Sequence, residues 1–191
     1  MRVVIGVDPG ASGALAVSVD GRLEIVVDMP KGPNASGKGE RVQPAVLADF
    51  VRDWQFRWSP SSALYVAVIE RVAAMPSQGV SSMFAFGHSL GAAEGVLSAM
   101  GVSVEWVTPS AWKADLGLST PKVKREPFAD EKEAKKAKAH AKAQAKAASR
   151  AAAARLFPSH AAAFLRVKDD GRAEAALMTH WYATRRGGGG E

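Results

Sequence analysis

The stretch VVIGVDPGASGALAVSVDG, residues 3–21, places a carboxylate, Asp8, between a short apolar run and a Pro-Gly turn. A run of Val and Ile is typical of a strand buried on both faces, where an ionised group at its end is costly unless cations or donors compensate it. The alternating residues 14–19 lead into Asp20-Gly21, a typical hairpin turn, and then into a further apolar run over 23–27. The opening therefore predicts three consecutive strands, with an acid at the end of the first.

Asp8 taken alone leaves three interpretations open. The glycines around it, Gly6, Gly10 and Gly13, permit tight turning and a close backbone approach, as in a hairpin that binds a nucleotide phosphate. The acid could equally bind a metal ion, or could simply be exposed where a strand meets a turn. The rest of the chain has to decide between these interpretations.

The composition predicts one globular domain with a polyanionic partner. The chain has 191 residues, 47% of them apolar and 23% charged, and no apolar segment long enough to cross a bilayer. It has no cysteine, which excludes disulfides and thiolate zinc sites, and its first residues do not have the pattern of a signal peptide, so we expect a cytoplasmic protein without membrane contact. The net charge of +6 favours a partner such as nucleic acid.

The remaining sequence predicts alternating helices and strands, and hence an α/β protein. Residues 30–40, rich in Gly, Pro, Ser and Lys, predict a mobile loop. The other expected elements are a helix over 42–57, a strand over 64–69 that ends on Glu70, a helix over 79–100, a strand over 102–107, a short helical turn bearing Trp112 and Lys113, a long helix over 129–157 and an amphipathic helix over 170–185.

Three glycines recur at every fourth residue of the helix expected over 79–100, namely Gly87, Gly91 and Gly95. Glycine lowers helix propensity, so this row predicts a surface that packs very closely on one helix face. Either the sheet of the same chain or a second subunit could provide the partner.

Four carboxylates are expected to converge. Asp8 and Glu70 end two strands that would be neighbours in a parallel arrangement, and Asp170 and Glu174 are four residues apart on one helix face. Together they would repel strongly unless divalent cations were bound. Oxygen-only ligation suits Mg²⁺ or Mn²⁺, and two such ions about 4 Å apart can promote phosphodiester hydrolysis.

The segment from 129 to 157 is rich in Ala and Lys and predicts a long, solvated, basic helix, preceded by a flexible link over 119–127. A row of lysines is commonly just a soluble surface, but in a basic protein with an acidic site it could also contact phosphates. The candidate nucleic-acid contacts are Lys122, Lys124, Lys142, Lys146 and Arg150.

Several motifs occur together in one order: IGVDPGASGALAV, VIERV with the following MPSQGVSSMFAFGHSLGAAEGVL, VTPSAWK, SRAAAARLFP and DDGRAEAALMTHW. In this set the chain resembles the RuvC-like Holliday junction resolvases of the ribonuclease H superfamily, especially compact phage and prophage members. The resemblance implies a ribonuclease H-like fold, an α/β structure with a five-stranded mixed sheet, the first three strands antiparallel, flanked by helices. It also implies a single nuclease domain over 1–186 with a basic helical insertion at about 119–150 and a flexible tail over 187–191.

The resemblance also implies which residues bind the metal ions and which lie near the cleaved phosphate. Asp8, Glu70, Asp170 and Glu174 correspond to the family's metal-binding acidic quartet, with Asp170 favoured over Asp169 because DGRAEA gives the best match. Lys113 follows the fifth strand, where relatives carry a lysine near the cleaved phosphate, and Lys146 corresponds to a further lysine of the site.

The function expected from the resemblance is a homodimeric, metal-dependent endonuclease. It would resolve four-way DNA junctions by paired symmetric nicks that leave 5′-phosphate ends, with two Mg²⁺ per active site and Mn²⁺ as a substitute. The helix over 79–100 would build the dimer. Two alternatives remain at this point: a ribonuclease H-like nuclease for other branched DNA or RNA, and an ATP-binding phosphotransferase of the actin and sugar-kinase type. The latter needs a second phosphate hairpin, which the sequence does not show.

Overall fold

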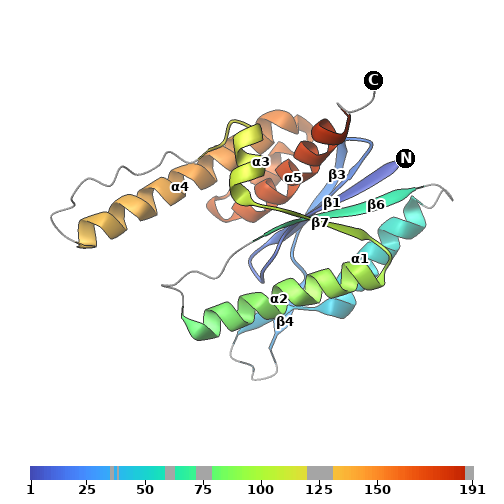
Figure 1. Cartoon of the computed structure of the whole chain (residues 1–191), viewed down its shortest axis with the longest axis horizontal. Coiled ribbons are helices and arrows are strands. Elements are labelled where there is room, and N and C mark those ends of the chain that lie inside the picture. The colour runs from blue at the N-terminus through green and yellow to red at the C-terminus, as the bar shows by residue number, and fades with distance from the viewer. Residues whose placement is uncertain (35–36, 38, 59–62, 72–78, 120–130, 188–191) are drawn as a thin grey trace.

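A central sheet with helices on both faces organises the molecule (Figure 1). The computed structural model describes residues 1–34, 37, 39–58, 63–71, 79–119 and 131–187. Helices α1 (Pro44–Arg57) and α2 (Val80–Ala99) cover one face of the sheet. Helices α3 (Pro109–Asp115), α4 (Glu131–Leu156) and α5 (Asp170–Gly187) lie on the other face, with two short 3₁₀ helices, η1 (Pro158–Phe164) and η2 (Val167–Asp169), between α4 and α5.

The sheet is mixed and has the strand order β3-β2-β1-β6-β7. Its first three strands, β1 (Arg2–Asp8), β2 (Ala14–Val19) and β3 (Arg22–Asp28), are antiparallel. Strands β6 (Leu64–Glu70) and β7 (Ser103–Val107) continue the sheet parallel to β1. The predicted five-stranded mixed sheet is therefore confirmed, including its three antiparallel strands.

Strand β1 separates two apolar cores because its side chains alternate between the faces. Val3, Ile5 and Val7 pack toward α1 and α2, whereas Val4 packs toward α4 and α5. All four side chains are at most 1% exposed, as expected for a central strand with helices on both sides.

Helix α5 lies unusually close to β1. A Cβ at Gly6 would be only 2.0 Å from the carbonyl oxygen of Ala175, so the helix backbone rests directly on the strand backbone at this point. Ala173, Ala176 and Leu177 of α5 are fully buried against the same face. This contact fixes the position of the first turns of α5, which carry Asp170 and Glu174.

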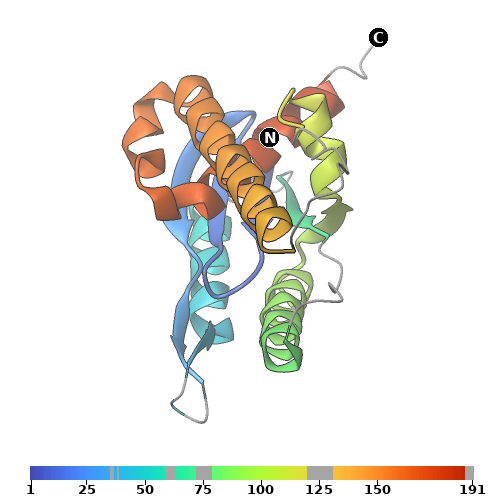
Figure 2. The same ribbon diagram turned by 90° about the vertical axis from the view of Figure 1, so that its left-hand side faces the viewer.

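The expectation of a mobile loop over 30–40 is wrong for the described residues of this segment. Strands β4 (Lys31–Pro33) and β5 (Glu40–Val42) form an antiparallel hairpin that extends from the body of the molecule (Figure 2). An ion pair of 2.6 Å between Lys31 and Glu40 and the buried side chains of Met29 and Val42 hold its base. Residues 35, 36 and 38 lie outside the described part.

The row of glycines on α2 does not face its own sheet. A Cβ at Gly87, Gly91 or Gly95 would have nothing within 4 Å among the described residues. Packing of this row within the chain is therefore a wrong expectation. The same helix exposes two large apolar side chains near its start, Val80 at 85% and Phe84 at 76%.

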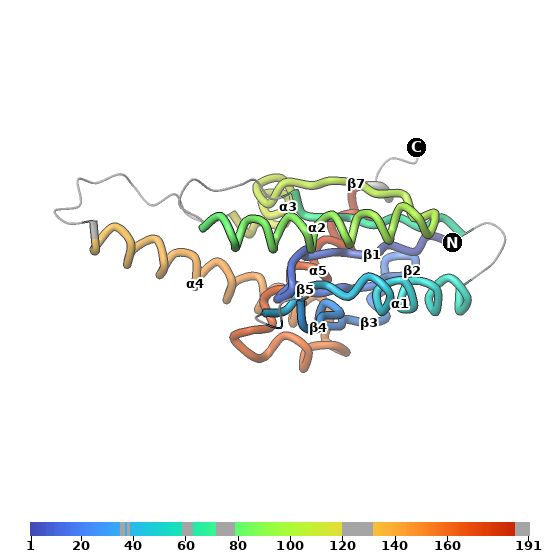
Figure 3. Tube along the Cα trace, turned by 90° about the horizontal axis from the view of Figure 1, so that it is seen from below, coloured from blue at the N-terminus to red at the C-terminus, as the bar shows by residue number. Residues whose placement is uncertain are grey.

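Helix α4 extends well beyond the rest of the molecule in its first half (Figures 1 and 3). Its last turns pack on α5, where Ala152 and Ala153 are buried. The candidate contacts Lys122 and Lys124, and the expected link apart from Ser119, lie outside the described residues. Within the described ranges, no helix combines the length and the apolar character needed to cross a membrane.

Candidate active site

Asp8 and Glu70 lie side by side at the ends of two neighbouring parallel strands. Val7 of β1 pairs with Ile69 of β6, so the next residue of each strand is an acid. Glu70 is 8% exposed, and the indole Nε1 of Trp112 donates a hydrogen bond of 3.1 Å to its Oε1. The position of this carboxylate is thus fixed by a buried side chain of α3.

The first turns of α5 bring two further carboxylates to the same place. Gly171 lies so close to Asp8 that a Cβ there would be 2.7 Å from the Asp8 Oδ2 atom. Asp170 precedes this glycine, and Glu174 follows it by three residues, about one helical turn. The predicted convergence of Asp8, Glu70, Asp170 and Glu174, here called the acidic quartet, is what the structure displays.

The acidic quartet is electrostatically strained. Desolvation, followed by repulsion from Glu70, Glu174 and Asp170, raises the pKa of Asp8 from 3.8 to about 8, against the opposing effect of Lys113. Burial and the charge of Glu174 likewise raise the pKa of Glu70. Such carboxylates hold a net negative charge only if cations accompany them.

Two lysines supply cations in this structure. The Nζ of Lys113 is 2.7 Å from the Glu174 Oε1, and both side chains are largely buried, 17% and 13% exposed. Lys146 of α4 forms an ion pair with Asp170. Ser149, 1% exposed and one turn after Lys146, donates a hydrogen bond of 3.3 Å to the same oxygen of Glu174.

Asp169 is separate from the acidic quartet. Its carboxylate is 1% exposed and binds the Arg166 guanidinium at 2.7 Å as well as the Arg166 backbone N–H at 2.8 Å. These bonds hold the pKa of Asp169 below its usual range. The residue therefore stabilises the turn before α5, and its neighbour Asp170 is the one directed toward Asp8.

The donor chemistry of the acidic quartet suits a hard divalent cation, because every donor is a carboxylate oxygen and Asp8 needs a counter-charge. As the side chains stand, no group of three or more acids or histidines in the described ranges is arranged to hold a metal ion. Glu174 and Asp170 are held instead by Lys113 and Lys146. The residues thus fit Mg²⁺ or Mn²⁺ in type, and binding requires those two carboxylates to exchange partners.

Sequence reasoning missed the residues that fix the acids. Trp112 and Ser149 are polar partners of Glu70 and Glu174, and only their positions next to Lys113 and Arg150 could have drawn attention to them. Of the predicted nucleic-acid contacts, Lys142 is exposed on α4. Arg150 donates a hydrogen bond of 3.2 Å to the carbonyl of Val167, which ties α4 to η2.

A groove of about 480 Å³ opens beside the turn that follows Asp8. The turn over 9–12 forms one wall, Lys31 and Glu40 of the hairpin form another, and α2 contributes Phe86 and Ser89. The ring of Phe86 lies 3.5 Å from the position of a Cβ on Gly10.

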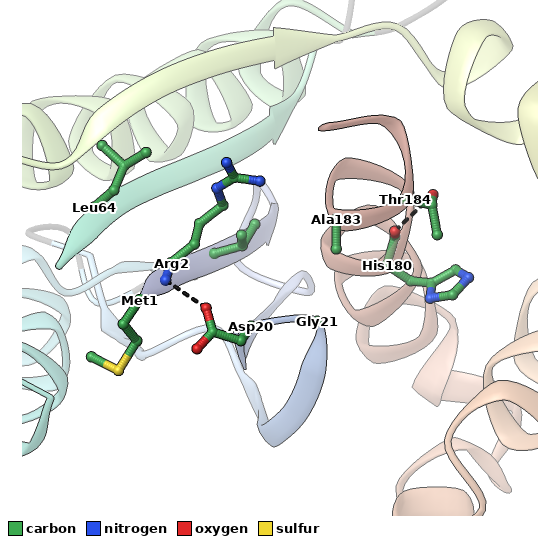
Figure 4. Close-up of a pocket in the computed structure, with 9 residues that line it drawn as sticks. Met1, Arg2, Asp20, Gly21, Leu64, His180, Ala183 and Thr184 are labelled. Carbon is green, nitrogen blue, oxygen red and sulfur yellow. Dashed lines mark hydrogen bonds between the residues drawn. The ribbon is translucent and has the colours of Figure 1, made fainter. Parts of the chain in front are cut away.

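A larger hollow, about 680 Å³, lies at the opposite end of β1 (Figure 4). It is bounded by the first residues of β1, by Asp20 and Gly21, and by His180 and Thr184 of α5. Because β1 begins at this hollow and ends at Asp8, the two features are separated by the length of the strand. The hollow is not part of the candidate active site.

Comparison with solved structures identifies the fold. The structure of T. thermophilus RuvC in complex with Holliday junction substrate covers 97% of this chain and 96% of its own, with a TM-score of 0.55 and 19% identity. The chain has the fold of RuvC. A second Thermus thermophilus RuvC structure matches over the same shares with a TM-score of 0.50 and 20% identity. The resemblance in sequence motifs is thus confirmed at the level of the fold, although no family model and no curated protein matches the chain.

Proposed function

We propose that the protein is a metal-dependent endonuclease that cleaves DNA at four-way junctions. The observation that carries the proposal is the convergence of the acidic quartet with two lysines, on a fold shared with RuvC. A cluster of oxygen donors flanked by cationic side chains suits phosphodiester hydrolysis, in which negative charge develops on the phosphate. The RuvC with the same fold is bound to a Holliday junction.

The acidic quartet would hold two divalent ions, Mg²⁺ or in its place Mn²⁺. When bound, these ions would supply Lewis acidity and lower the pKa of water, which together favour phosphodiester hydrolysis. The 5′-phosphate product is part of the proposal. Trp112 holds Glu70 in place by its hydrogen bond, and Ser149 does the same for Glu174. Lys113 and Lys146, released from Glu174 and Asp170, would then be free to bind the phosphate that carries the developing charge.

A homodimer is part of the proposal because a junction is resolved by paired nicks in two strands. The free face of α2 supports it: three glycines with open space above them, continued by the exposed side chains of Val80 and Phe84. An apolar face of this kind on a helix is typical of a surface that another chain covers. Small residues at every fourth position allow two helices to approach closely.

Cleavage assays with three substrates test the function. A synthetic four-way junction, a linear duplex and a DNA–RNA hybrid are incubated with Mg²⁺ and either wild-type protein, Asp8→Asn or Asp49→Asn. The control residue Asp49 is exposed on α1, and its partner among the described residues is Arg52 on the same helix. We expect selective, symmetric cutting of the junction by the wild type and by Asp49→Asn, whereas Asp8→Asn binds the junction without cutting it. Equal cutting of all three substrates would refute junction selectivity.

A further inference from the structure

We propose that one face of α4, formed by Lys135, Lys138 and Lys142, is a phosphate-binding surface along which one arm of the bound DNA leaves the active site. This surface, here called the lysine ladder, rests on the proposed function and extends it beyond the acidic quartet. The proposal gives the projecting half of α4 a role, because one arm of the DNA would lie along it.

Contacts at the end of α4 show which side of this helix is turned toward the acidic quartet. Lys146 pairs with Asp170 and Ser149 binds Glu174, so the side of α4 that carries these two residues faces the acidic quartet. Lys142, Lys138 and Lys135 precede Lys146 by four, eight and eleven residues, which are the spacings that return to one helix face. The ladder therefore lies on the side of α4 that faces the acidic quartet, and extends from there toward the start of the helix.

The charges of the ladder are available to a ligand. Its three side chains are exposed, and none has an ion pair or a hydrogen bond within the described part of the chain. The sequence contains no acid between Glu133 and Asp169, so the two glutamates at the start of α4 lie beyond the outer end of the ladder. The stretch of α4 from Lys135 to Lys146 thus carries basic and no acidic side chains.

Repulsion within the ladder points to a polyanion. Lys138, Lys142 and Lys146 are spaced by four, and like charges at this spacing each destabilise a helix by about 0.2–0.5 kcal/mol. The projecting half of α4 buries no large apolar side chain and depends on the helix propensity of Ala and Lys. Bound phosphates would remove the repulsion and stabilise the helix.

The dimensions match a nucleic-acid backbone. A rise of about 1.5 Å per residue gives a ladder about 16 Å long from Lys135 to Lys146. One strand of B-DNA has a phosphate about every 3.4 Å along the axis, so the ladder spans about five nucleotides. Flexible lysine side chains, acting as point charges, suit contacts that do not depend on sequence.

Salt-dependent binding to a four-way junction tests the ladder. The variant Lys138→Gln with Lys142→Gln is compared with the control Lys136→Gln with Arg155→Gln, which removes the same charge. The control residues Lys136 and Arg155 are exposed and lie on α4 about 120° and 140° around the helix axis from Lys142, and at least about 100° from Lys138. Affinity is measured in metal-free buffer or with Ca²⁺, which avoids cleavage, on a junction with arms of about 15 base pairs.

Each lost phosphate contact reduces the slope of log K against log salt by about 0.9, which at 0.1 M salt is an affinity loss of about 8-fold. We expect the ladder variant to lose about 60-fold in affinity and about two units of slope, and the control to stay within about threefold of the wild type.

The outcomes separate the ladder from the proposed function. Equal losses of affinity for both variants would overturn the ladder. They would leave the nuclease proposal intact, because that proposal is tested separately by the cleavage assays with Asp8→Asn. If linear duplex and junction bind equally but only the ladder variant loses affinity, the ladder stands and junction selectivity is refuted. Absence of any binding to nucleic acid by the wild type would overturn both.

Discussion

The carboxylate of Asp8 lies directly against Gly171, the second residue of α5, where a Cβ would come within 2.7 Å of its Oδ2 atom. Gly171 therefore allows the start of α5 to meet the end of β1, and its neighbour Asp170 joins the acidic quartet through this contact. The close approach of Gly6 and Ala175 further along α5 keeps the helix from moving away.

Replacing Gly171 with alanine should disturb the active site more than the fold. The added methyl group must displace the Asp8 carboxylate or the first turn of α5, while overpacking of this kind typically lowers the free energy of unfolding by about 1–3 kcal/mol. We expect junction cleavage to fall at least about tenfold, with a far-ultraviolet circular dichroism spectrum like that of the wild type. Unchanged cleavage by a folded Gly171→Ala variant would show that the position of Asp8 does not matter.

The raised pKa of Asp8 predicts a pH dependence of metal-free stability. Between the ordinary pKa of 3.8 and about 8, the folded protein keeps a proton on Asp8 that the unfolded chain releases. The free energy of unfolding attributable to Asp8 therefore falls as the pH rises through this window, by at most about 1.4 kcal/mol per pH unit, and is constant above it.

Urea denaturation in EDTA at several pH values measures this effect. The stability of Asp8→Asn relative to the wild type should increase from pH 5 to pH 8 and then level off, because asparagine does not titrate. Asp49→Asn should run parallel to the wild type. A relative stability of Asp8→Asn that does not change with pH would contradict the raised pKa.

Divalent ions should restore the stability that the wild type loses as the pH rises. Metal binding requires deprotonated carboxylates, so Mg²⁺ or Mn²⁺ should raise the melting temperature more at pH 8 than at pH 6. Calorimetry should detect binding to the wild type and little or none to Asp8→Asn. Equal binding to both proteins would exclude Asp8 as a ligand.

The two lysines should contribute unequally to metal-free stability. Lys113 and Glu174 are largely buried, so Lys113→Met leaves an uncompensated charge and should lower the free energy of unfolding by about 3 kcal/mol. Lys146, 41% exposed in its pair with Asp170, should matter by about 1 kcal/mol or less.

Denaturant titrations in EDTA give both values. Combining Lys113→Met with Glu174→Gln should recover part of the loss, since the second change removes the unpaired charge. Additive effects of these two substitutions would mean that the 2.7 Å pair carries no coupling energy.

The glycine row of α2 distinguishes an open surface from a dimer contact. A methyl group at Gly91 would meet none of the described residues of the same chain within 4 Å, so Gly91→Ala should stabilise the monomer by about 1 kcal/mol through helix propensity. In a closely packed pair of α2 helices the same methyl group should weaken association. Sedimentation velocity and chemical denaturation together measure both effects, and a monomeric wild type that cleaves junctions fully at micromolar concentration would refute the dimer.

The five strands and the members of the acidic quartet could be predicted because each is marked by a local pattern, whereas the mixed five-stranded arrangement was implied by the resemblance. The apolar run before Asp8, the run before Glu70 and the four-residue spacing of Asp170 and Glu174 each signal an element and a direction. The hairpin over 31–42 was missed because its strands have three residues each and almost no apolar alternation. Turn-forming residues dominate that segment, and the ion pair that closes it depends on a pairing register that local patterns do not reveal.

The supporting contacts of the site were beyond prediction for a different reason. The bonds from Trp112 to Glu70 and from Ser149 to Glu174 join residues 42 and 25 positions apart, on three helices and a strand whose mutual placement follows only from the packed core. The partner of the glycine row stayed open because the sequence shows that the side chains of this face are small without showing what lies opposite them. The space above Gly91 becomes known only when the whole chain is placed.

Helix α5 follows every strand of the sheet in chain order, and it both fills the core beneath β1 and delivers half of the acidic quartet. A partly folded form that has its strands but has not docked α5 would hold Asp8 and Glu70 without Asp170 and Glu174. Such a form has two of the four carboxylates and lacks the spacing of the full set, so completion of the core also completes the candidate site. Under the proposed function, a misfolded or truncated molecule would leave DNA uncut.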